Sequence, residues 1–357
     1  MDKPFIAGIQ QIGIGVSKVY EAWKWYRLTF GMNIPMFDEA ATANLMLPYT
    51  NNTPQNRHAV LALNMGGGGA IEIWQYTSRQ AQAANFDIQV GDYGIYCCKI
   101  KCKNVVNFYN KCKTQKQAIV GKINFDPTNM PYFFMHDPYG NLFQIIQADN
   151  FFGQTKSYTG GVYGSIIGVS NIDKARHLYS DILGYDTVLY DETKTFSDLH
   201  PLPGGHLNFR RVLLSHSKNR QGAFSHMLGS TQIELLQVQN RQAQKIYKNR
   251  LWGDLGFIHL CFDIWGMKDL RKLCKDKGFP FTVDSSDALN GRFNMGKAAG
   301  HFAYIEDPDG TLIEFVETHK IPILKKLNWY LDLNKRNAAK PLPNYILKTL
   351  ALNSIKN

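Results

Sequence analysis

Apolar and polar residues alternate in many short runs of this chain, and each such run predicts a β-strand with one face in the core. In residues 254–264 Ile258, Leu260 and Phe262 share one face and His259 lies on the other. Residues 311–317 follow a Pro-Asp-Gly turn and place Glu314 in the middle of a strand. Two interpretations explain such polar residues: a bound metal ion, or a hydrogen-bonded core histidine and a carboxylate at the rim.

The same arrangement of elements recurs four times, at intervals of about 80 residues. Each unit reads as a strand, a helix and about three further strands, and the first and third helices end at Gly31 and Gly184. The units span about residues 6–80, 90–149, 160–238 and 252–318. We therefore predict an α+β fold, in which four βαβββ modules form two cup-shaped mixed β-sheets with flanking helices.

Glycines at the end of residues 148–160 mark a linker between two halves of the chain. We predict an N-terminal pair of modules in residues 1–150, a C-terminal pair in residues 160–319, and a basic amphipathic tail in residues 320–357. The tail has two interpretations. Its apolar side chains pack against the body, or its lysines and apolar residues make a weak contact with an anionic membrane surface.

The composition is that of an ordinary globular protein, with 44% hydrophobic and 19% charged residues in a chain of 357. Of the net charge of +11, the tail carries +7, from eight Lys or Arg and one Asp. The remainder is too small for a nucleic-acid groove, so no nucleic-acid partner is expected. No apolar run reaches the ~18 residues of a membrane span. The six cysteines include no C-x-x-C pair, which favours the cytoplasm; a monomer is compatible with these features.

The closing strands follow the pattern Asp-Pro-x-Gly-x-x-x-Glu/Gln in residues 137–144 and 307–314. Together with the helix-ending glycines, this pattern resembles the vicinal oxygen chelate superfamily. That superfamily includes glyoxalase I, methylmalonyl-CoA epimerase, extradiol dioxygenases, and fosfomycin and bleomycin resistance proteins. The resemblance covers residues 6 to about 318. It implies that two modules form each cup, and that each module gives one metal ligand from its first strand and one from its closing strand.

The ligand positions that the resemblance implies depend on how the modules pair. The first-strand positions are Gln11, Cys97, Gly164 and His259, and the closing-strand positions are Glu72, Gln144, Glu234 and Glu314. If sequence neighbours pair, neither cup has a good set, and one lacks a ligand at Gly164. If the outer modules pair, as in single-chain glyoxalase I proteins with four modules, one cup combines Gln11, Glu72, His259 and Glu314. This second set matches a glyoxalase I ligand set and is our predicted metal site.

Two carboxylates, an imidazole and an amide oxygen suit one divalent ion, Zn²⁺ in the first place, with Ni²⁺, Co²⁺, Mn²⁺ or Fe²⁺ as alternatives. The expected partner is a small-molecule substrate that chelates the ion through adjacent oxygens, and the ion acts as a Lewis acid on its carbonyl. By resemblance, Glu314 is the general base that removes a neighbouring C–H proton, and Glu72 returns it. The implied activity is that of a glyoxalase-like isomerase or lyase.

Two positions depart from glyoxalase I. Gly15 stands where its glutathione-binding arginine lies, and Tyr76 stands where it has an asparagine. A glutathione substrate is therefore not expected. The histidines outside the first-strand positions are interpreted as surface or hydrogen-bonding residues, and these include His58, His200, His206, His216, His226 and His301.

Two other functions stay open from the sequence. A ring-cleaving or 2-oxoacid-type dioxygenase of the same superfamily needs two histidines and one carboxylate on iron, but only His259 lies at a first-strand position. A non-catalytic protein that binds an aromatic or antibiotic-like ligand is the other. Trp74 and Tyr76 share the inward face with Glu72 and would line its pocket, or they simply pack in the core.

Overall fold

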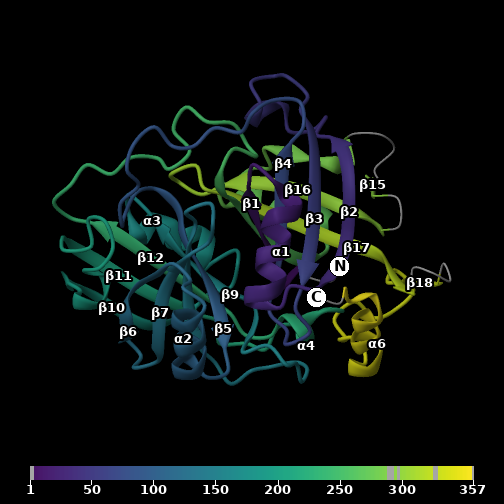
Figure 1. Cartoon of the computed structure of the whole chain (residues 1–357). Coiled ribbons are helices and arrows are strands. Elements are labelled where there is room, and N and C mark those ends of the chain that lie inside the picture. The colour runs from purple at the N-terminus through teal and green to yellow at the C-terminus, as the bar shows by residue number, and fades with distance from the viewer. Residues whose placement is uncertain (1–3, 288–292, 296–297, 325–328, 356–357) are drawn as a thin grey trace.

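The computed structural model describes residues 4–287, 293–295, 298–324 and 329–355. They form two curled mixed β-sheets with helices packed on them (Figure 1). The predicted α+β fold is confirmed, and the two sheets fit the four predicted modules. We call the sheet of the first and fourth modules the outer sheet, and the sheet of the second and third modules the inner sheet.

The strands of each sheet follow a similar order in space. The outer sheet runs β14 (Val283–Asp284), β16 (Ala298–Glu306), β17 (Leu312–Leu324), β13 (Gly256–Trp265), β1 (Phe5–Gly15), β4 (Ala70–Tyr76), β3 (Asn56–Leu63) and β2 (Ile34–Thr42). At its margin β15 (Phe293–Met295) pairs with β16, and β18 (Trp329–Asp332) pairs with β17. The inner sheet runs β10 (Thr187–Thr195), β11 (Asn208–Ser215), β12 (Gln232–Val238), β9 (Thr159–Gly168), β5 (Gly94–Cys102), β8 (Leu142–Gln147), β7 (Pro131–His136) and β6 (Ile119–Phe125).

The central strands show which modules pair, a question that the sequence leaves open. β1 pairs antiparallel with β13 in the outer sheet, and β5 pairs antiparallel with β9 in the inner sheet. Each sheet thus combines one module from the N-terminal half of the chain with one from the C-terminal half. The halves predicted at residues 1–150 and 160–319 describe the order of the modules along the sequence. Neither half forms a sheet by itself, because each sheet contains strands of both halves.

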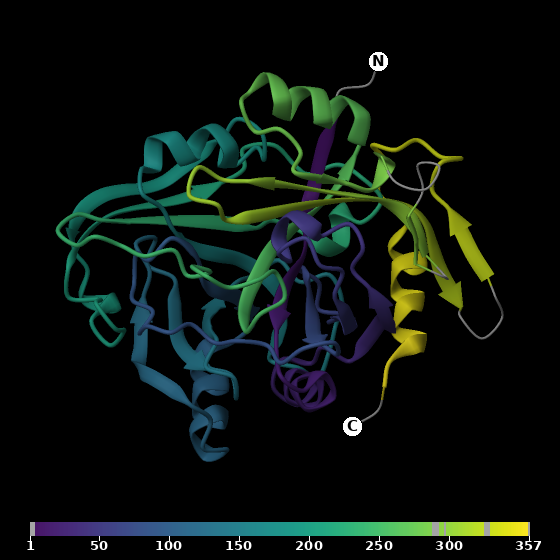
Figure 2. The same cartoon turned by 90° about the horizontal axis from the view of Figure 1, so that it is seen from above.

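Each module contributes one main helix. These are α1 (Val19–Phe30), α2 (Val105–Thr114), α3 (Ile172–Tyr179) and α5 (Met267–Asp276). Figure 2 shows α3 and α5 along one side of the molecule and α1 and α2 along the other. The other helices within the described residues are short: α4 (Ser225–Leu228), α6 (Asn344–Lys348) and the 3-10 helices η1 (Leu47–Tyr49), η2 (Ser197–Leu199), η3 (Ser285–Asp287) and η6 (Thr349–Asn353).

Local sequence determines where α1 ends, whereas a tertiary contact stabilises its N-terminus. The helix ends at Gly31, whose φ of +68° is the left-handed conformation that glycine adopts at low cost. From the sequence, Ser17 is expected to cap this helix, but the N-cap position is Lys18, which makes no side-chain capping hydrogen bond, and the helix begins at Val19. The amide of Val19 donates instead to the side-chain oxygen of Gln75 in β4, at 2.8 Å. The sheet therefore supplies the acceptor that the helix needs at its N-terminus.

One apolar core joins the two sheets and the main helices. Ile12 and Ile313 of the outer sheet and Ile145 and Leu235 of the inner sheet are fully buried in it. Because side chains alternate along a strand, the neighbours of Ile313 point to the opposite face of the outer sheet. That face, away from the helices, carries polar residues such as Glu314 together with a second apolar cluster that includes Trp74 and Tyr304.

Two buried tyrosines tie consecutive modules together across the core. The hydroxyl of Tyr26 in α1 donates to Asp137 in the turn before β8, at 2.5 Å. The hydroxyl of Tyr179 in α3 donates to Asp307 in the turn before β17, at 3.0 Å. Each aspartate belongs to an Asp-Pro-x-Gly turn. The repeated turns therefore also receive the helix of the preceding module.

The C-terminal tail packs against the outer sheet. After β17 it forms β18, which pairs back onto β17, and then α6 and η6. Leu347 and Leu350 are each 1% exposed, in a cluster with Ile34 and Leu63 of the outer sheet. This burial supports the interpretation in which the tail packs on the body. Leu327, another apolar residue of the tail, lies outside the described residues.

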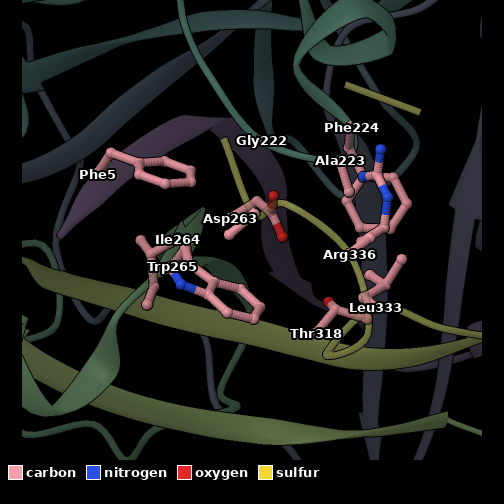
Figure 3. Close-up of a pocket in the computed structure, with 11 residues that line it drawn as sticks. Phe5, Gly222, Ala223, Phe224, Asp263, Ile264, Trp265, Thr318, Leu333 and Arg336 are labelled. Carbon is pink, nitrogen blue, oxygen red and sulfur yellow. The ribbon is translucent and has the colours of Figure 1, made fainter. Parts of the chain in front are cut away.

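The first part of the tail closes over the end of β13. Leu333 and Arg336 lie with Asp263 and Trp265 around a small cavity (Figure 3). The Arg336 guanidinium donates to the carbonyl oxygens of two other tail residues, at 2.8 and 3.0 Å. Burial raises the pKa of Asp263 to about 8, although a hydrogen bond from Gln10 opposes this.

All six cysteines are buried and free, in agreement with the absence of a C-x-x-C pair. Among the described residues no helix is long and apolar enough to cross a membrane. The cytoplasmic location stays a prediction.

The paired tyrosines generate a prediction about stability. Tyr26→Phe and Tyr179→Phe should each lower the free energy of unfolding by about 1.5–3 kcal/mol, because each removes a buried hydrogen bond to a carboxylate. Urea unfolding followed by circular dichroism measures this loss. Tyr20→Phe in α1 is the matched control: its hydroxyl also bonds an aspartate, but the residue is 54% exposed. Equal losses in all three variants would contradict the prediction.

The packing of the tail generates a second prediction about stability. Leu350→Ala should cost about 2–5 kcal/mol of stability, as for other buried leucines. Leu352→Ala, two residues further on, should cost little, since Leu352 is 68% exposed. Thermal melts of the two variants make the comparison. A tail that only rests on the surface would give the same small effect for both.

Candidate metal centre

Four polar side chains meet on the face of the outer sheet that lies away from the helices. Strand register explains how, because Gly13 in β1 pairs with Glu72 in β4 on one side and with His259 in β13 on the other. A Cβ atom at Gly13 would lie 2.5 Å from the His259 ring, so the missing side chain makes room for the imidazole. On the same strands Gln11 pairs opposite Cys261, which pairs in turn with Glu314 in β17.

The predicted ligands Gln11, Glu72, His259 and Glu314 are all brought together. His259 Nε2 lies 3.1 Å from Glu314 Oε2 and 3.3 Å from Glu72 Oε2. Gln11 Nε2 donates to Glu72 Oε2 at 3.1 Å and to Glu314 Oε2 at 3.4 Å. His259 is fully buried, and the Glu72 and Glu314 side chains keep only 12% and 10% exposure.

The electrostatics of this centre depend on a positive charge. Burial alone lowers the pKa of His259, but the charges of Glu314 and Glu72 outweigh it and raise the pKa to about 10. Burial alone raises the pKa of Glu314, and the charge of His259 more than offsets it, so that the pKa falls below its ordinary value. The protonated imidazole thus holds two carboxylates that would otherwise repel one another.

The donor set fits a divalent metal ion. The ligand atoms of Glu72, His259 and Glu314 lie within 4.8 Å of one another. Within the described structure, Gln11 Oε1 and both His259 ring nitrogens are buried and have no hydrogen bond of ordinary geometry. A buried polar atom without a partner costs about 1–3 kcal/mol. A cation between these groups would engage Gln11 Oε1 and one His259 nitrogen, and would balance the two carboxylates.

Several residues around the centre escaped the sequence analysis. Tyr304 in β16 pairs opposite Glu314, and its ring contacts the His259 ring edge to face, with centroids 5.6 Å apart. The Trp252 ring lies nearly parallel to that of His259, at 6.4 Å. The strand glycine Gly13 was the available signal, because a glycine inside a strand indicates a close approach. Trp252 lies just before β13 and outside any strand, where strand periodicity gives no information.

The aromatic residues predicted to face inward form a packed cluster. Trp74 and Tyr76 are 0% and 4% exposed and pack with Trp252 and Tyr304. The Tyr76 hydroxyl donates to the carbonyl oxygen of Trp252. Their position favours core packing over the lining of an open pocket.

The inner sheet carries a different arrangement at the equivalent positions. Glu234 is fully buried and forms ion pairs with Lys99 Nζ and Arg211 Nε, each at 2.5 Å. Burial raises the pKa of Glu234, but Arg211 and Lys99 lower it to about 2. Lys99 pairs opposite Gly164, and Gly164 is the inner-sheet position equivalent to Gln11. Two protein cations therefore satisfy this carboxylate.

The other two predicted inner positions contribute no ligand set either. Cys97 is buried, and burial raises its pKa well above the ordinary thiol value. Gln144 is fully buried, and its amide atoms have no hydrogen-bond partner in the described part of the chain. Among the described residues, Cys97 belongs to no cluster of three His, Cys, Asp or Glu side chains that could hold a metal ion.

Most of the remaining histidines have local partners away from the centre. His58 lies 2.7 Å from Asp38, His216 bonds the carbonyl oxygen of Lys218 at 2.9 Å, and His226 bonds Asn344 at 3.0 Å. His200 and His206 are exposed. None of these five comes to the metal centre.

Comparisons with known proteins address the fold. Glyoxalase I from Zea mays is similar in structure with a TM-score of 0.53 at 13% identity, over 97% of this chain and 96% of that one. A putative dioxygenase from Bacillus subtilis gives a TM-score of 0.55 at 12% identity, over 87% of this chain and 85% of that one. The fold is that of the vicinal oxygen chelate proteins. At these identities the likeness extends to the fold and not to the activity.

Comparisons of sequence give no match. No family model matches the chain. No curated protein matches it either. The vicinal oxygen chelate fold predicted from the repeats is thus confirmed by structure, while the ligand residues rest on their own geometry.

The centre generates a prediction about metal content. Glu314→Gln and His259→Ala should each lose one tightly bound divalent ion per chain relative to the parent protein, because each removes a charged or imidazole ligand. Elemental analysis of protein purified without added metal or a His-tag measures this. Cys97→Ala and Gln144→Ala at the equivalent inner positions are the matched controls and should keep the ion. Loss of the ion from these inner variants would place the metal elsewhere.

Proposed function

We propose that this protein is a divalent-metal-dependent isomerase or lyase that moves a proton next to the carbonyl of a small substrate. The observation that supports it is the convergence of two buried carboxylates, one imidazole and one amide on one face of the outer sheet. Such a set holds an ion and still leaves a carboxylate oxygen free to accept a proton. The substrate class is a small molecule with two adjacent oxygens.

The ion expected here is Zn²⁺, with Ni²⁺, Co²⁺, Mn²⁺ and Fe²⁺ as alternatives, and Gln11, Glu72, His259 and Glu314 would hold it. When bound, it supplies Lewis acidity toward a substrate carbonyl. The proton-transfer steps of the reaction are assigned to side chains of this protein.

Glu314 is proposed as the general base. Its carboxylate is buried beside His259, Tyr304 and Cys261, and its lowered pKa keeps it ionised at neutral pH. A base in such a site accepts a proton from carbon without competition from solvent. Glu72, which reaches the same point from β4, is proposed to return the proton on the other face of the substrate.

The surroundings argue against glutathione as part of the substrate. A Cβ atom at Gly15 would lie 2.0 Å from the carbonyl oxygen of Asp254, so the backbone leaves no room there for an arginine. Tyr76 is buried beneath Trp252. We therefore propose a substrate smaller than a glutathione adduct.

The alternatives are weaker on the same geometry. A dioxygenase iron site needs two histidines with one carboxylate, and among the described residues the set around Glu314 contains one histidine, His259. A non-catalytic binding protein has no need of two buried carboxylates around an imidazole. The membrane contact of the tail stays a prediction, as does the monomeric state.

The proposal is tested by proton exchange. The zinc- or cobalt-loaded protein should exchange the α-proton of hemithioacetals of small thiols, or of α-hydroxyketones, with deuterated solvent under anaerobic conditions. Nuclear magnetic resonance follows the loss of the proton signal. Glu314→Gln should stop the exchange even where excess metal restores occupancy, because the base itself is gone.

Cys261→Ala is the matched control, since Cys261 lies beside Glu314 but has no assigned role in proton transfer. It should keep most of the exchange. An activity that appears only with Fe²⁺ and consumes O₂ would overturn the proposal in favour of a dioxygenase. A metal-free protein that binds aromatic ligands and exchanges nothing would favour the binding protein.

A further inference from the structure

A second group of metal-ligating side chains lies on the opposite face of the outer sheet. His301 in β16 pairs directly opposite Glu317 in β17, and His319 follows two residues later on β17. Glu314 points to the first centre, and strand alternation turns Glu317 to the other face. The two groups therefore share strands β16 and β17 but are separated by the sheet itself.

The three side chains converge on one point. Their ligand atoms all lie within 4.8 Å of one another. The rings of His301 and His319 have centroids 4.8 Å apart and meet at 71°. His319 Nε2 lies 3.8 Å from Glu317 Oε2. These separations allow small rotamer changes to bring two imidazole nitrogens and one carboxylate oxygen onto an ion at about 2.0–2.2 Å.

Strand irregularity helps to aim His319. The pairing of β16 with β17 passes from Gly300–Thr318 to Ala299–Lys320, which leaves His319 as the extra residue of a register shift. Bulges of this kind redirect a side chain and occur often beside functional sites. Here the shift leaves His319 on the same side of the sheet as Glu317 and His301.

Glu317 is held in place by the start of α5. Its Oε1 accepts a hydrogen bond from the amide of Gly266 at 3.0 Å, and its Oε2 accepts one from Met267 at 3.2 Å. A carboxylate has about four acceptor directions, so both oxygens retain capacity for an ion. The carboxylate is therefore buried, oriented and still able to bind, as the ligands of metal sites commonly are.

We propose that His301, Glu317 and His319 bind a second divalent transition-metal ion, independently of the first centre. Two imidazoles and one carboxylate suit Zn²⁺, Co²⁺ or Fe²⁺. This assigns His301 a role beyond the hydrogen-bonding one expected from the sequence. The amide of Leu333 in the tail donates to the carbonyl oxygen of His319 at 2.8 Å, so the ion would also stiffen the point where the tail is attached.

The test counts ions in four forms of the full chain. Zn²⁺ titration followed by isothermal calorimetry should find two sites in the parent, one in His319→Ala, one in His259→Ala and none in the double variant. The affinity of the second site should fall at least about 100-fold in His319→Ala, because loss of a direct ligand costs no less than loss of an outer-shell partner. His301→Ala should behave as His319→Ala does.

His200→Ala, an exposed histidine, is the matched control and should keep both sites. Each single variant retains one site, and that site reports that the chain is folded. Two sites in His319→Ala, or a parent whose single site vanishes in His259→Ala, would overturn the proposal. Failure of the first centre appears instead as no change in His259→Ala, so the two outcomes are distinguishable.

Discussion

Strands β1 and β13 come from opposite ends of the chain, and their antiparallel pairing positions every ligand of the candidate metal centre. It places His259 against the space left by Gly13, and it sets Gln11 opposite Cys261. The parallel partners β4 and β17 then add one carboxylate each. Without this long-range contact the four residues would form two separate pairs, Gln11 with Glu72 and His259 with Glu314. The chemistry of the centre is thus a property of the tertiary fold.

Burying a carboxylate requires a compensating charge, and the two sheets meet this requirement in different ways. In the inner sheet Lys99 and Arg211 neutralise Glu234 permanently. In the outer sheet Glu72 and Glu314 share one imidazole, whose proton carries the positive charge of the ligand set. A proton can be displaced by a stronger cation, whereas a lysine cannot leave. The inner cup therefore compensates its carboxylate with fixed charges, whereas the outer cup does so with a proton that a bound cation could displace.

Much of the fold could be predicted from the sequence, because each module repeats the same signals. The Asp-Pro-x-Gly turns, Gly31 and the alternation around His259 are local features, and local features are readable. The candidate ligands could be assigned as well, since Glu72 and Glu314 occupy equivalent closing-strand positions. Their assignment depended on a choice between two pairings that only long-range contacts decide.

The rest lay beyond local pattern for identifiable reasons. The acceptor for the Val19 amide is Gln75, which follows it by many residues, so no capping pattern at Ser17 could reveal it. The grouping of His301 with His319 depends on a register shift between two strands. Periodicity gives the face of a side chain, but it does not give the strand that lies beside it.

Because the modules pair crosswise, the linker between β8 and β9, residues 148–158, joins the two halves of both sheets. A chain cut there would yield two fragments, each with half of both sheets, and each with two of the four ligands of the outer centre. Neither fragment could close a cup alone, because its β1 or β13 edge would lack its neighbour. The linker keeps the two halves of both sheets on one chain, so that they meet without an association step that depends on protein concentration.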